Sequence, residues 1–516
     1  MSDESATPRA DTQYPAPSTR YSPRAERVIL MVWDGMRPDS VTDEVTPHLR
    51  RLMQGGAAYT HAVGVFPSVT RPTTTSVSTG TYPLAHGVFS NQFTGGPGDR
   101  ATIDTSDRAS VERLRAYNGG RMVPPQTLAE ALVAAGKRVV SMGSGSTGQV
   151  TCLDGERVGT TVHVTFTHPE ALMGTLVERL GPVPERKIPV QEANDWLVRA
   201  LTDYVLPEMG PEVVLMWLCE PDASQHGRGL GAPESLDSIR GNDARLGRVL
   251  DAVETSGVPT TMIVASDHGH STVTGMIHAA NTMADAGFGP QLADGLIHLA
   301  EKALTIEPHD GAEALRREIG AWLLAQPFTN GVVCWPDAHG ETLPDMLTPH
   351  SLYGPRPRPA FAHAPTFSWS TAWDDGYTNE FGVPGGAVTG GFVERMADFS
   401  KLQGPIVGMN QLTATHGTLA PADQRTVLAL HGAGIRSGIV NVPAGVVDIA
   451  PTILALLGLP PLSAADGRAL TEAFADGPAP ESVAVKTEAL ATLRNGAPLR
   501  RHTVGTTAYV DTTPTE

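Results

Sequence analysis

The chain has 516 residues and a formal net charge of −17. This length supports a large buried core, and we expect one main domain that carries an insertion. The acidic balance argues against a nucleic-acid polymer as partner, because binding a phosphate backbone requires basic surface, but it leaves a small phosphorylated substrate open. The three cysteines, Cys152, Cys219 and Cys334, form no CxxC pair, which indicates buried free thiols instead of a disulfide framework or a thiolate zinc site.

The first 26 residues are polar and rich in proline, so we expect this segment to be flexible. They contain no apolar stretch of the kind found in a secretory signal, and the sequence nowhere holds eighteen consecutive apolar residues. We therefore expect a cytoplasmic protein with no membrane partner. The oligomeric state stays unknown at this stage.

Three apolar runs rich in β-branched residues end in acidic or histidine side chains. RVILMVWDG ends at Asp34, EVVLMWLCEPD at Asp222, and TTMIVASDHG at Asp267 and His268. Runs of this kind are typical of strands buried on both faces, and they alternate with helical patterns such as PQTLAEALVAAG and GNDARLGRVLDAVETSG. The pattern predicts an α/β fold with a doubly wound, largely parallel sheet and helices on both faces. In such sheets ligands bind beyond the carboxyl ends of the strands, where these side chains lie.

The residue types at these strand ends suit a metal ion. EPDASQH places Asp222 and His226 four residues apart, a spacing that turns both side chains to one side of a helix, and SDHGH places Asp267 beside His268. Carboxylates and imidazoles are the ligands that a Zn²⁺-type ion accepts. A single aspartate after a strand can equally well cap the next helix, so the residues alone leave both interpretations open.

The stretch VFPSVTRPTTTSVSTG, residues 65–80, is rich in hydroxyl side chains. It is either a solvated loop or a loop that holds one activated nucleophile. Pro67 and Pro72 restrict the backbone on either side of Thr70, which predicts a shaped turn, with Thr73 to Thr79 opening a helix.

Six motifs occur in one order along the chain: VWDGMRPD, PSVTRPTTTSVSTGTYPLAHGVFSN, EPDASQHGRG, ASDHGHST, ATHGTL and VVDIAPTILALLGLPP. Together they resemble the alkaline phosphatase superfamily, and within it the type I phosphodiesterase and nucleotide pyrophosphatase family, which is related to phosphonoacetate hydrolase. The resemblance implies a catalytic core of residues 27–275 and 405–480. It leaves residues 276–404 as an inserted cap that selects the substrate, and residues 481–516 as a C-terminal extension.

The resemblance also implies site residues. It implies two divalent metal ions, with zinc as the usual occupant, and a nucleophile at Thr70. The ligands that it assigns to one ion are Asp34, Thr70, Asp267 and His268, and those that it assigns to the other are Asp222, His226 and His416. Asn91 falls where the family keeps an asparagine that donates a hydrogen bond to a non-bridging oxygen. Thr70, Pro72 and Thr74 stand where sulfatases carry Cys-x-Pro-x-Arg, so a formylglycine mechanism is not expected.

Several other residues near the motifs have open roles. We expect His86 to be a packed or capping histidine, and His270 and His278 to support the ligands or to lie at the surface. Arg71 either reads a charge on the substrate or pairs with a carboxylate, and we expect it to face away from the metals and to reach only a distal substrate group. The aromatic and histidine side chains of the cap either line the pocket or form the cap's own core; they are His350, His363, Trp369, Trp373 and Tyr377.

The combined expectation is a metal-dependent hydrolase that cleaves phosphodiester or pyrophosphate bonds of a small phosphorylated molecule through a phosphothreonine intermediate. One alternative is a phosphonate or phosphomonoester hydrolase on the same metals. A further alternative is a non-catalytic binding protein that has kept the fold.

Overall fold

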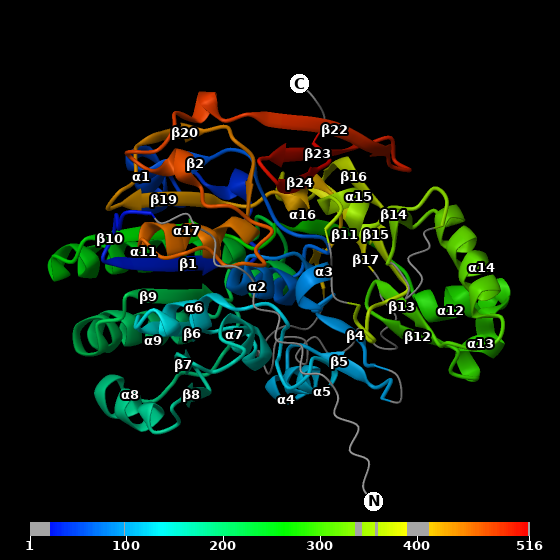
Figure 1. The fold of residues 1–516 in the computed structure, drawn as a ribbon, viewed down its shortest axis with the longest axis horizontal. Coiled ribbons are helices and arrows are strands. Elements are labelled where there is room, and N and C mark those ends of the chain that lie inside the picture. Colours follow the sequence, from blue (N-terminus) through cyan, green and yellow to red (C-terminus); the bar gives the residue numbers. More distant parts are fainter. Residues whose placement is uncertain (1–20, 97–98, 336–342, 357–359, 390–411, 514–516) are drawn as a thin grey trace, which may run out of the picture.

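The structure is a computed structural model that describes residues 21–96, 99–335, 343–356, 360–389 and 412–513. A nine-stranded sheet forms its centre (Figure 1). The strand order is β20 (Gly438–Val440), β2 (Ala57–Tyr59), β19 (Leu428–Gly432), β10 (Thr260–Ala265), β1 (Arg27–Trp33), β9 (Val213–Leu218), β6 (Val139–Gly143), β7 (Thr160–His163) and β8 (Phe166–His168). The five strands from β10 to β7 run parallel, whereas β19 and β8 flank them in the antiparallel sense.

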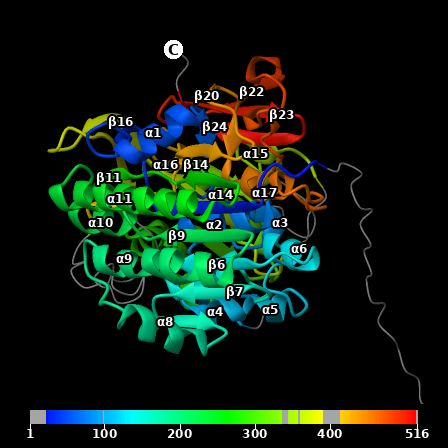
Figure 2. The same cartoon turned by 90° about the vertical axis from the view of Figure 1, so that its left-hand side faces the viewer.

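The sheet is covered on both faces, as β1 shows. Val28, Leu30 and Val32 belong to one hydrophobic core, and the alternate residues of β1 belong to the other. On the first side pack α2 (Thr70–Thr79), α6 (Leu128–Ala134) and α17 (Ile449–Leu456), and on the second pack α1 (Pro47–Gly55), α9 (Gln191–Ala200) and α11 (Pro233–Ser256) (Figure 2). The predicted doubly wound α/β fold is confirmed.

The ends of two predicted helices follow from their local sequence. Thr127 and Glu130 form a capping box at the start of α6. Helix α11 begins at Pro233, earlier than the GNDARLGRVLDAVETSG pattern indicated, because proline fits the first turn, where its missing N–H needs no partner. Gly257 ends α11 with a φ of 64°, a left-handed conformation that suits glycine.

Much of the chain between β10 and β19 forms smaller sheets, to the right of the central sheet in Figure 1. One has the order β12 (Ile297–Ala300), β13 (Ala303–Ile306), β15 (Phe367–Thr371) and β14 (Thr329–Cys334), and α14 (Ala312–Ala325) packs with it around a separate core. The other has the order β16 (Trp373–Thr378), β17 (Pro384–Thr389), β11 (Ser271–Met276) and β18 (Ala414–Thr415). The expected cap boundary at residues 404 and 405 lies outside the described residues.

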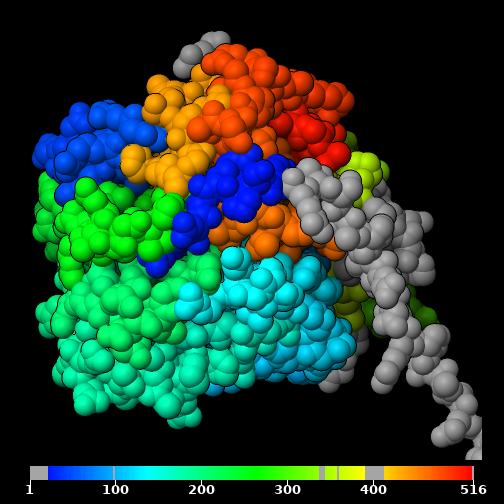
Figure 3. Space-filling view, turned by 60° about the vertical axis from the view of Figure 1, so that its left-hand side comes forward, coloured from blue at the N-terminus to red at the C-terminus, as the bar shows by residue number. Residues whose placement is uncertain are grey.

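The C-terminal strands β22 (Val485–Thr492), β23 (Pro498–Val504) and β24 (Thr507–Asp511) form a three-stranded sheet. It is tied to the core, because the buried Tyr509 donates a hydrogen bond from its hydroxyl to Asp448 Oδ2 at 2.8 Å. Figure 3 shows the first described residues, in blue, against the orange segment near residue 456, where Arg24 N donates to Leu456 O at 2.8 Å. Residues 1–20 of the segment expected to be flexible lie outside the described residues.

Further elements are β3 (Ala62–Val63), β4 (Gln92–Thr94), β5 (Thr102–Asp104), β21 (Ala444–Gly445), α3 (Pro83–His86), α4 (Arg108–Glu112), α5 (Leu114–Tyr117), α7 (Thr147–Leu153), α8 (Leu172–Leu180), α10 (Asp222–Arg228), α12 (Ala279–Met283), α13 (Gly289–Ala293), α15 (Pro349–Tyr353) and α16 (Pro421–Gln424). None of the described helices is long and apolar enough to cross a membrane. The three cysteines are free and buried, as predicted.

Candidate metal centre and active site

The candidate ligands gather at the carboxyl ends of three neighbouring strands. Asp34 follows β1, Asp222 opens α10 after β9, and Asp267 and His268 follow β10. Because β1 pairs in parallel with both β9 and β10, these strand ends lie side by side. His416 comes from a distant part of the chain, directly after β18.

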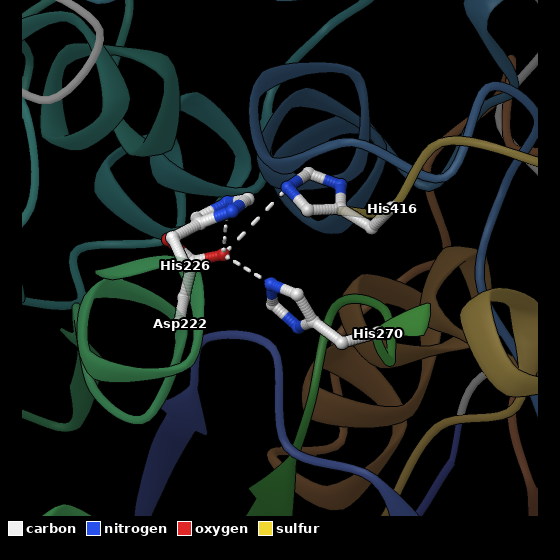
Figure 4. Close-up of side chains that lie close together, drawn as sticks. All are labelled: Asp222, His226, His270 and His416. Carbon is white, nitrogen blue, oxygen red and sulfur yellow. Dashed lines mark ion pairs between the residues drawn. The ribbon is translucent and has the colours of Figure 1, made fainter. Parts of the chain in front are cut away.

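One cluster surrounds the carboxylate of Asp222 (Figure 4). Its Oδ1 lies 3.2 Å from His226 Nε2 and 3.6 Å from His416 Nε2. The structure adds His270, whose Nε2 is also 3.2 Å from Asp222 Oδ1. The four potential ligand atoms lie within 4.8 Å of one another, close enough for a single ion to reach them all.

The second cluster surrounds His268, whose ring stacks on that of His416 with 3.6 Å between the centroids. His268 Nε2 lies 3.2 Å from Asp267 Oδ2, 3.5 Å from Asp34 Oδ1 and 3.4 Å from the Thr70 hydroxyl. The structure therefore brings together all seven residues that the resemblance assigned to the metals.

Hydrogen bonds outside the clusters orient the carboxylates. Trp217 Nε1 donates to Asp34 Oδ2 at 2.8 Å, and Gly35 N donates to Asp267 Oδ1 at 2.9 Å. The second oxygen of each carboxylate, Asp34 Oδ1 and Asp267 Oδ2, is buried, accepts no hydrogen bond within the described residues and faces His268. Outer hydrogen bonds of this kind are typical of metal sites, because they fix the ligands in place before the ion binds.

The histidines are oriented in the same way. The Nδ1 atoms of His226, His268 and His416 lie 2.7, 3.0 and 2.9 Å from the backbone carbonyl oxygens of Ala414, Gly269 and Ser68. A carbonyl oxygen can only accept, so each Nδ1 carries the proton. In the neutral form of each ring, Nε2 then presents a lone pair to its cluster, as a metal ligand requires.

The electrostatics of the buried carboxylates also favour cations. Burial raises the pKa of Asp34, and the charges of Asp267 and Asp222 add to this rise. Burial also raises the pKa of Asp267. Burial alone would raise the pKa of Asp222, but the neighbouring His226 outweighs it and holds the pKa of this carboxyl well below its usual range. Three buried carboxylates beside imidazole nitrogens form a donor set that fits divalent cations.

Thr70 is the first residue of α2, so the helix begins three residues before the predicted start at Thr73. Val69 is extended and serves as N-cap, and Pro72 fits the first turn because its missing N–H would have no partner there. Thr74 and Thr75 donate their hydroxyls to the carbonyls of Thr70 and Arg71 at 2.7 and 2.8 Å. Thr73, Thr74 and Thr75 are thus helix residues, and the hydroxyl of Thr70 is the one that reaches the clusters.

Asn91 and Arg71 lie beside Thr70. Asn91 Oδ1 accepts a hydrogen bond from Arg71 N at 3.1 Å, which leaves the Asn91 amide nitrogen as the donor for a substrate. The Arg71 side chain is buried; burial raises the pKa of the nearby Glu301, and the positive charge of Arg71 opposes this rise. Arg71 also acts on His226. Burial lowers the pKa of His226, the charge of Asp222 raises it and outweighs burial, and the charge of Arg71 opposes that rise. Arg71 is therefore buried near the site, and the expectation that its side chain faces away from the metals stays a prediction.

The inserted region reaches the site through residues that the sequence did not single out. Glu301 and Lys302 form the tip of the β12–β13 hairpin. Glu301 accepts hydrogen bonds from Ser90 Oγ and, at 3.2 Å, from Asn91 N, while Lys302 Nζ donates to the His416 carbonyl at 2.8 Å. No local pattern marks this hairpin tip, because its position depends on how the insertion packs against the core.

The cap residues that were candidates to line the pocket contact other parts of the protein. His363 Nε2 lies 2.9 Å from the Gly87 carbonyl, Trp369 belongs to the core of the insertion, and Trp373 is buried in the main core. Tyr377 packs beside Gly386, and the His350 carbonyl accepts from Arg501 of β23 at 3.5 Å. Trp369 thus agrees with the alternative that the side chains form the cap's own core, whereas Trp373 and His363 pack against the main core.

The remaining histidines have structural surroundings. His86 is buried between Ser76 Oγ and Val88 N, each 3.1 Å from a ring nitrogen, so it is the packed histidine that was predicted. His278 is the N-cap residue of α12. His270 differs from both, because it lies inside the Asp222 cluster.

This fold, with its ligand clusters at the strand ends, is an alkaline phosphatase-like fold. It is similar to alkaline phosphatase PafA, with a TM-score of 0.63 and 16% identity over 88% of this chain and 99% of that chain. It is also similar to murine ectonucleotide pyrophosphatase/phosphodiesterase 5, solved as an inactive threonine-to-alanine variant in complex with AMP, with a TM-score of 0.55 and 15% identity over 85% of this chain and 96% of that chain.

The family follows from the sequence comparison. The family model for type I phosphodiesterase / nucleotide pyrophosphatase matches residues 28–321, and the chain belongs to this family. A bis(5'-adenosyl)-triphosphatase of Mus musculus is 34% identical over 69 residues, which are 13% of this chain and 15% of that protein. An uncharacterized pyrophosphatase/phosphodiesterase of Schizosaccharomyces pombe is 36% identical over 66 residues, 13% of this chain and 14% of that protein. The matches thus span only a small part of each curated relative.

Proposed function

We propose that this protein hydrolyses phosphodiester or pyrophosphate bonds of a small phosphorylated molecule, with Thr70 as nucleophile at a site for two divalent ions, zinc first among them. The observation that carries this proposal is the position of the Thr70 hydroxyl, at the start of α2 and 3.4 Å from His268 Nε2, beside two ligand clusters. Asp34, Thr70, Asp267 and His268 would hold one ion, and Asp222, His226 and His416 the other. When bound, such ions favour the ionised hydroxyl and offset the charge of the phosphoryl oxygens.

The residues of the chain then have distinct tasks. Thr70 Oγ1 forms a bond to phosphorus, and the bond from phosphorus to the leaving oxygen breaks, so that the leaving group takes its electron pair. Water cleaves the resulting phosphothreonine and restores the hydroxyl. The Asn91 amide, fixed by the N–H of Arg71, donates to a non-bridging oxygen on which negative charge builds. In the murine neighbour, a threonine-to-alanine variant is inactive, which is the outcome we expect for Thr70.

A second candidate is a phosphonate or phosphomonoester hydrolase on the same site. Two basic side chains favour it: Arg71, whose charge reaches His226 and Glu301, and Lys302, whose Nζ lies 2.8 Å from the His416 carbonyl. Cations beside the phosphoryl group would help to bind a dianion. Glu301 offsets part of this charge, and we therefore keep the diester as the preferred substrate.

Hydrolysis of bis-p-nitrophenyl phosphate, p-nitrophenyl phosphate and an aryl phosphonate, each with added zinc and with a strong chelator, tests these alternatives. We expect the diester to have the highest kcat/KM and all three activities to disappear with the chelator. A higher kcat/KM for the monoester or phosphonate would favour the second candidate. Zinc uptake without hydrolysis of any of the three would point to a binding protein.

A further inference from the structure

His270 has the surroundings of a metal ligand, although the resemblance assigned it no such role. It stands directly before β11, and its side chain is fully buried. Figure 4 shows the rings of His226, His270 and His416 converging on the same carboxylate oxygen of Asp222. The ring centroids of His226 and His416 lie 4.8 and 5.0 Å from that of His270, so the three imidazoles enclose one small volume.

The hydrogen bonds of His270 identify which nitrogen faces the cluster with a lone pair. Its Nδ1 lies 3.3 Å from the Gly35 carbonyl oxygen, which can only accept, so Nδ1 carries the proton of a neutral ring. Nε2 is buried and makes no hydrogen bond within the described residues, although Asp222 Oδ1 is 3.2 Å away. His226 and His416 show the same arrangement, with Nδ1 on a backbone carbonyl and Nε2 towards Asp222.

The surrounding backbone fixes this orientation. Gly35 has a φ of 72°, and a Cβ built at this position would lie only 2.5 Å from His270 Cε1. The ring of His270 therefore occupies the space that a side chain at residue 35 would need. On the other side, the neighbouring Ser271 donates its hydroxyl to the buried Asp423 at 2.7 Å. His270 is thus held in place from both directions.

We propose that His270 is a fourth protein ligand of the ion in the Asp222 cluster, which then offers one carboxylate and three imidazoles. This proposal rests on the proposed function, because it concerns one of the two ions assumed there. Zn²⁺ accepts four protein ligands and can expand to five-coordination, so a fourth ligand still leaves a position for a phosphoryl oxygen. The Asp34 cluster offers a single imidazole, two carboxylates and a hydroxyl.

The direct test is a crystal structure of the full chain loaded with Zn²⁺ alone, with the ions located by anomalous scattering at the zinc edge. We expect a distance of about 2.0–2.1 Å from His270 Nε2 to the ion beside Asp222. An ion bound by Asp222, His226 and His416, with His270 Nε2 beyond about 3 Å, would overturn the proposal and leave the proposed function standing. Wild-type protein that takes up no zinc would overturn both.

Zinc binding in solution provides a second measurement, by competition with a chelating indicator. We expect His270→Asn to weaken one ion by at least about 10-fold and to leave the other unchanged. His278→Asn is the matched control, because His278 lies in the same stretch of chain outside the cluster, and it should bind both ions as the wild type does. Unchanged zinc affinity in His270→Asn would contradict the proposal.

Discussion

The buried imidazole of His363 should make the protein less stable in mild acid. The ring packs against Phe89, Phe93, Tyr117 and Phe361, and burial lowers the pKa of His363 to about 4, against a hydrogen bond to Gly87 that acts to raise it. Its ordinary pKa is 6.5. Between these values the unfolded chain binds a proton that the folded chain does not, so the free energy of unfolding falls as the pH drops through 6.5 towards 4.

The size of the effect follows from these two pKa values. At pH 5 the pH is about 1.5 units below the pKa of the histidine in the unfolded chain, so that histidine is protonated, while the ring in the folded protein is still mainly neutral. This difference lowers the free energy of unfolding by about 2 kcal/mol. At pH 7.5 the cost is close to zero. His363→Phe removes the titrating group and keeps an aromatic ring. Relative to the wild type, it should therefore gain about 2 kcal/mol of stability between pH 7.5 and pH 5, whatever its loss of the Gly87 hydrogen bond costs at both pH values.

Urea unfolding followed by tryptophan fluorescence at the two pH values measures this difference in the free energy of unfolding. The contributions of titrating groups that the wild type and the variant share cancel when the two are subtracted. Phe361→Leu is the matched control, because it disturbs the same ring cluster but leaves His363 in place. It should keep the pH dependence of the wild type. If the free energies of unfolding of His363→Phe and of the wild type change in parallel, within about 0.5 kcal/mol, the assignment of a buried neutral histidine is wrong.

Three further predictions concern the site. Asp34→Ala and His416→Ala should each lower the zinc content by about one ion, from different positions in a zinc-edge anomalous map, and loss of the same ion in both variants would contradict the partition of ligands. Asn91→Ala should lower kcat for an aryl diester by on the order of 10²-fold with its zinc content intact, and an unchanged kcat would remove Asn91 from catalysis. Arg71→Ala should keep the diester preference of the wild type; a wild-type preference for monoesters that collapses in this variant would instead establish the second candidate function.

The sheet and its ligand-bearing ends could be predicted because the signal is local. The run from Val28 to Trp33 is apolar at every position, as is typical of a strand covered on both faces, and Asp34 stands directly after it. Spacing alone could not bring His416 to Asp222, since these residues lie on separate elements and meet through tertiary packing. Their pairing came from the resemblance. The start of α2 was placed at Thr73 because the role of Val69 as N-cap depends on an extended backbone that the sequence does not reveal.

The residues that were missed differ in how visible they were. His268 and His270 are two residues apart, and such residues point to the same side of an extended segment, so SDHGH did contain a signal for His270. Glu301 and Lys302 had no comparable pattern, because a hairpin tip becomes part of a site only through the packing of the whole insertion. The aromatic residues of the cap were predicted where the structure does not need them for the site. Their composition made them candidates to line the pocket, but Trp369 packs in the core of the insertion.

Whether Thr70 is the nucleophile can be decided by kcat/KM for bis-p-nitrophenyl phosphate in zinc-loaded Thr70→Ala, Thr70→Ser and Thr73→Ala. We expect Thr70→Ala to lose nearly all turnover, and Thr70→Ser to keep part of it, because the hydroxyl remains and only the methyl group that restricts χ1 is lost. Thr73→Ala should stay active, since Thr73 lies within α2 and its backbone N–H bonds to Val69 O. Wild-type rates in Thr70→Ala, with activity abolished in Thr73→Ala, would contradict the proposed mechanism.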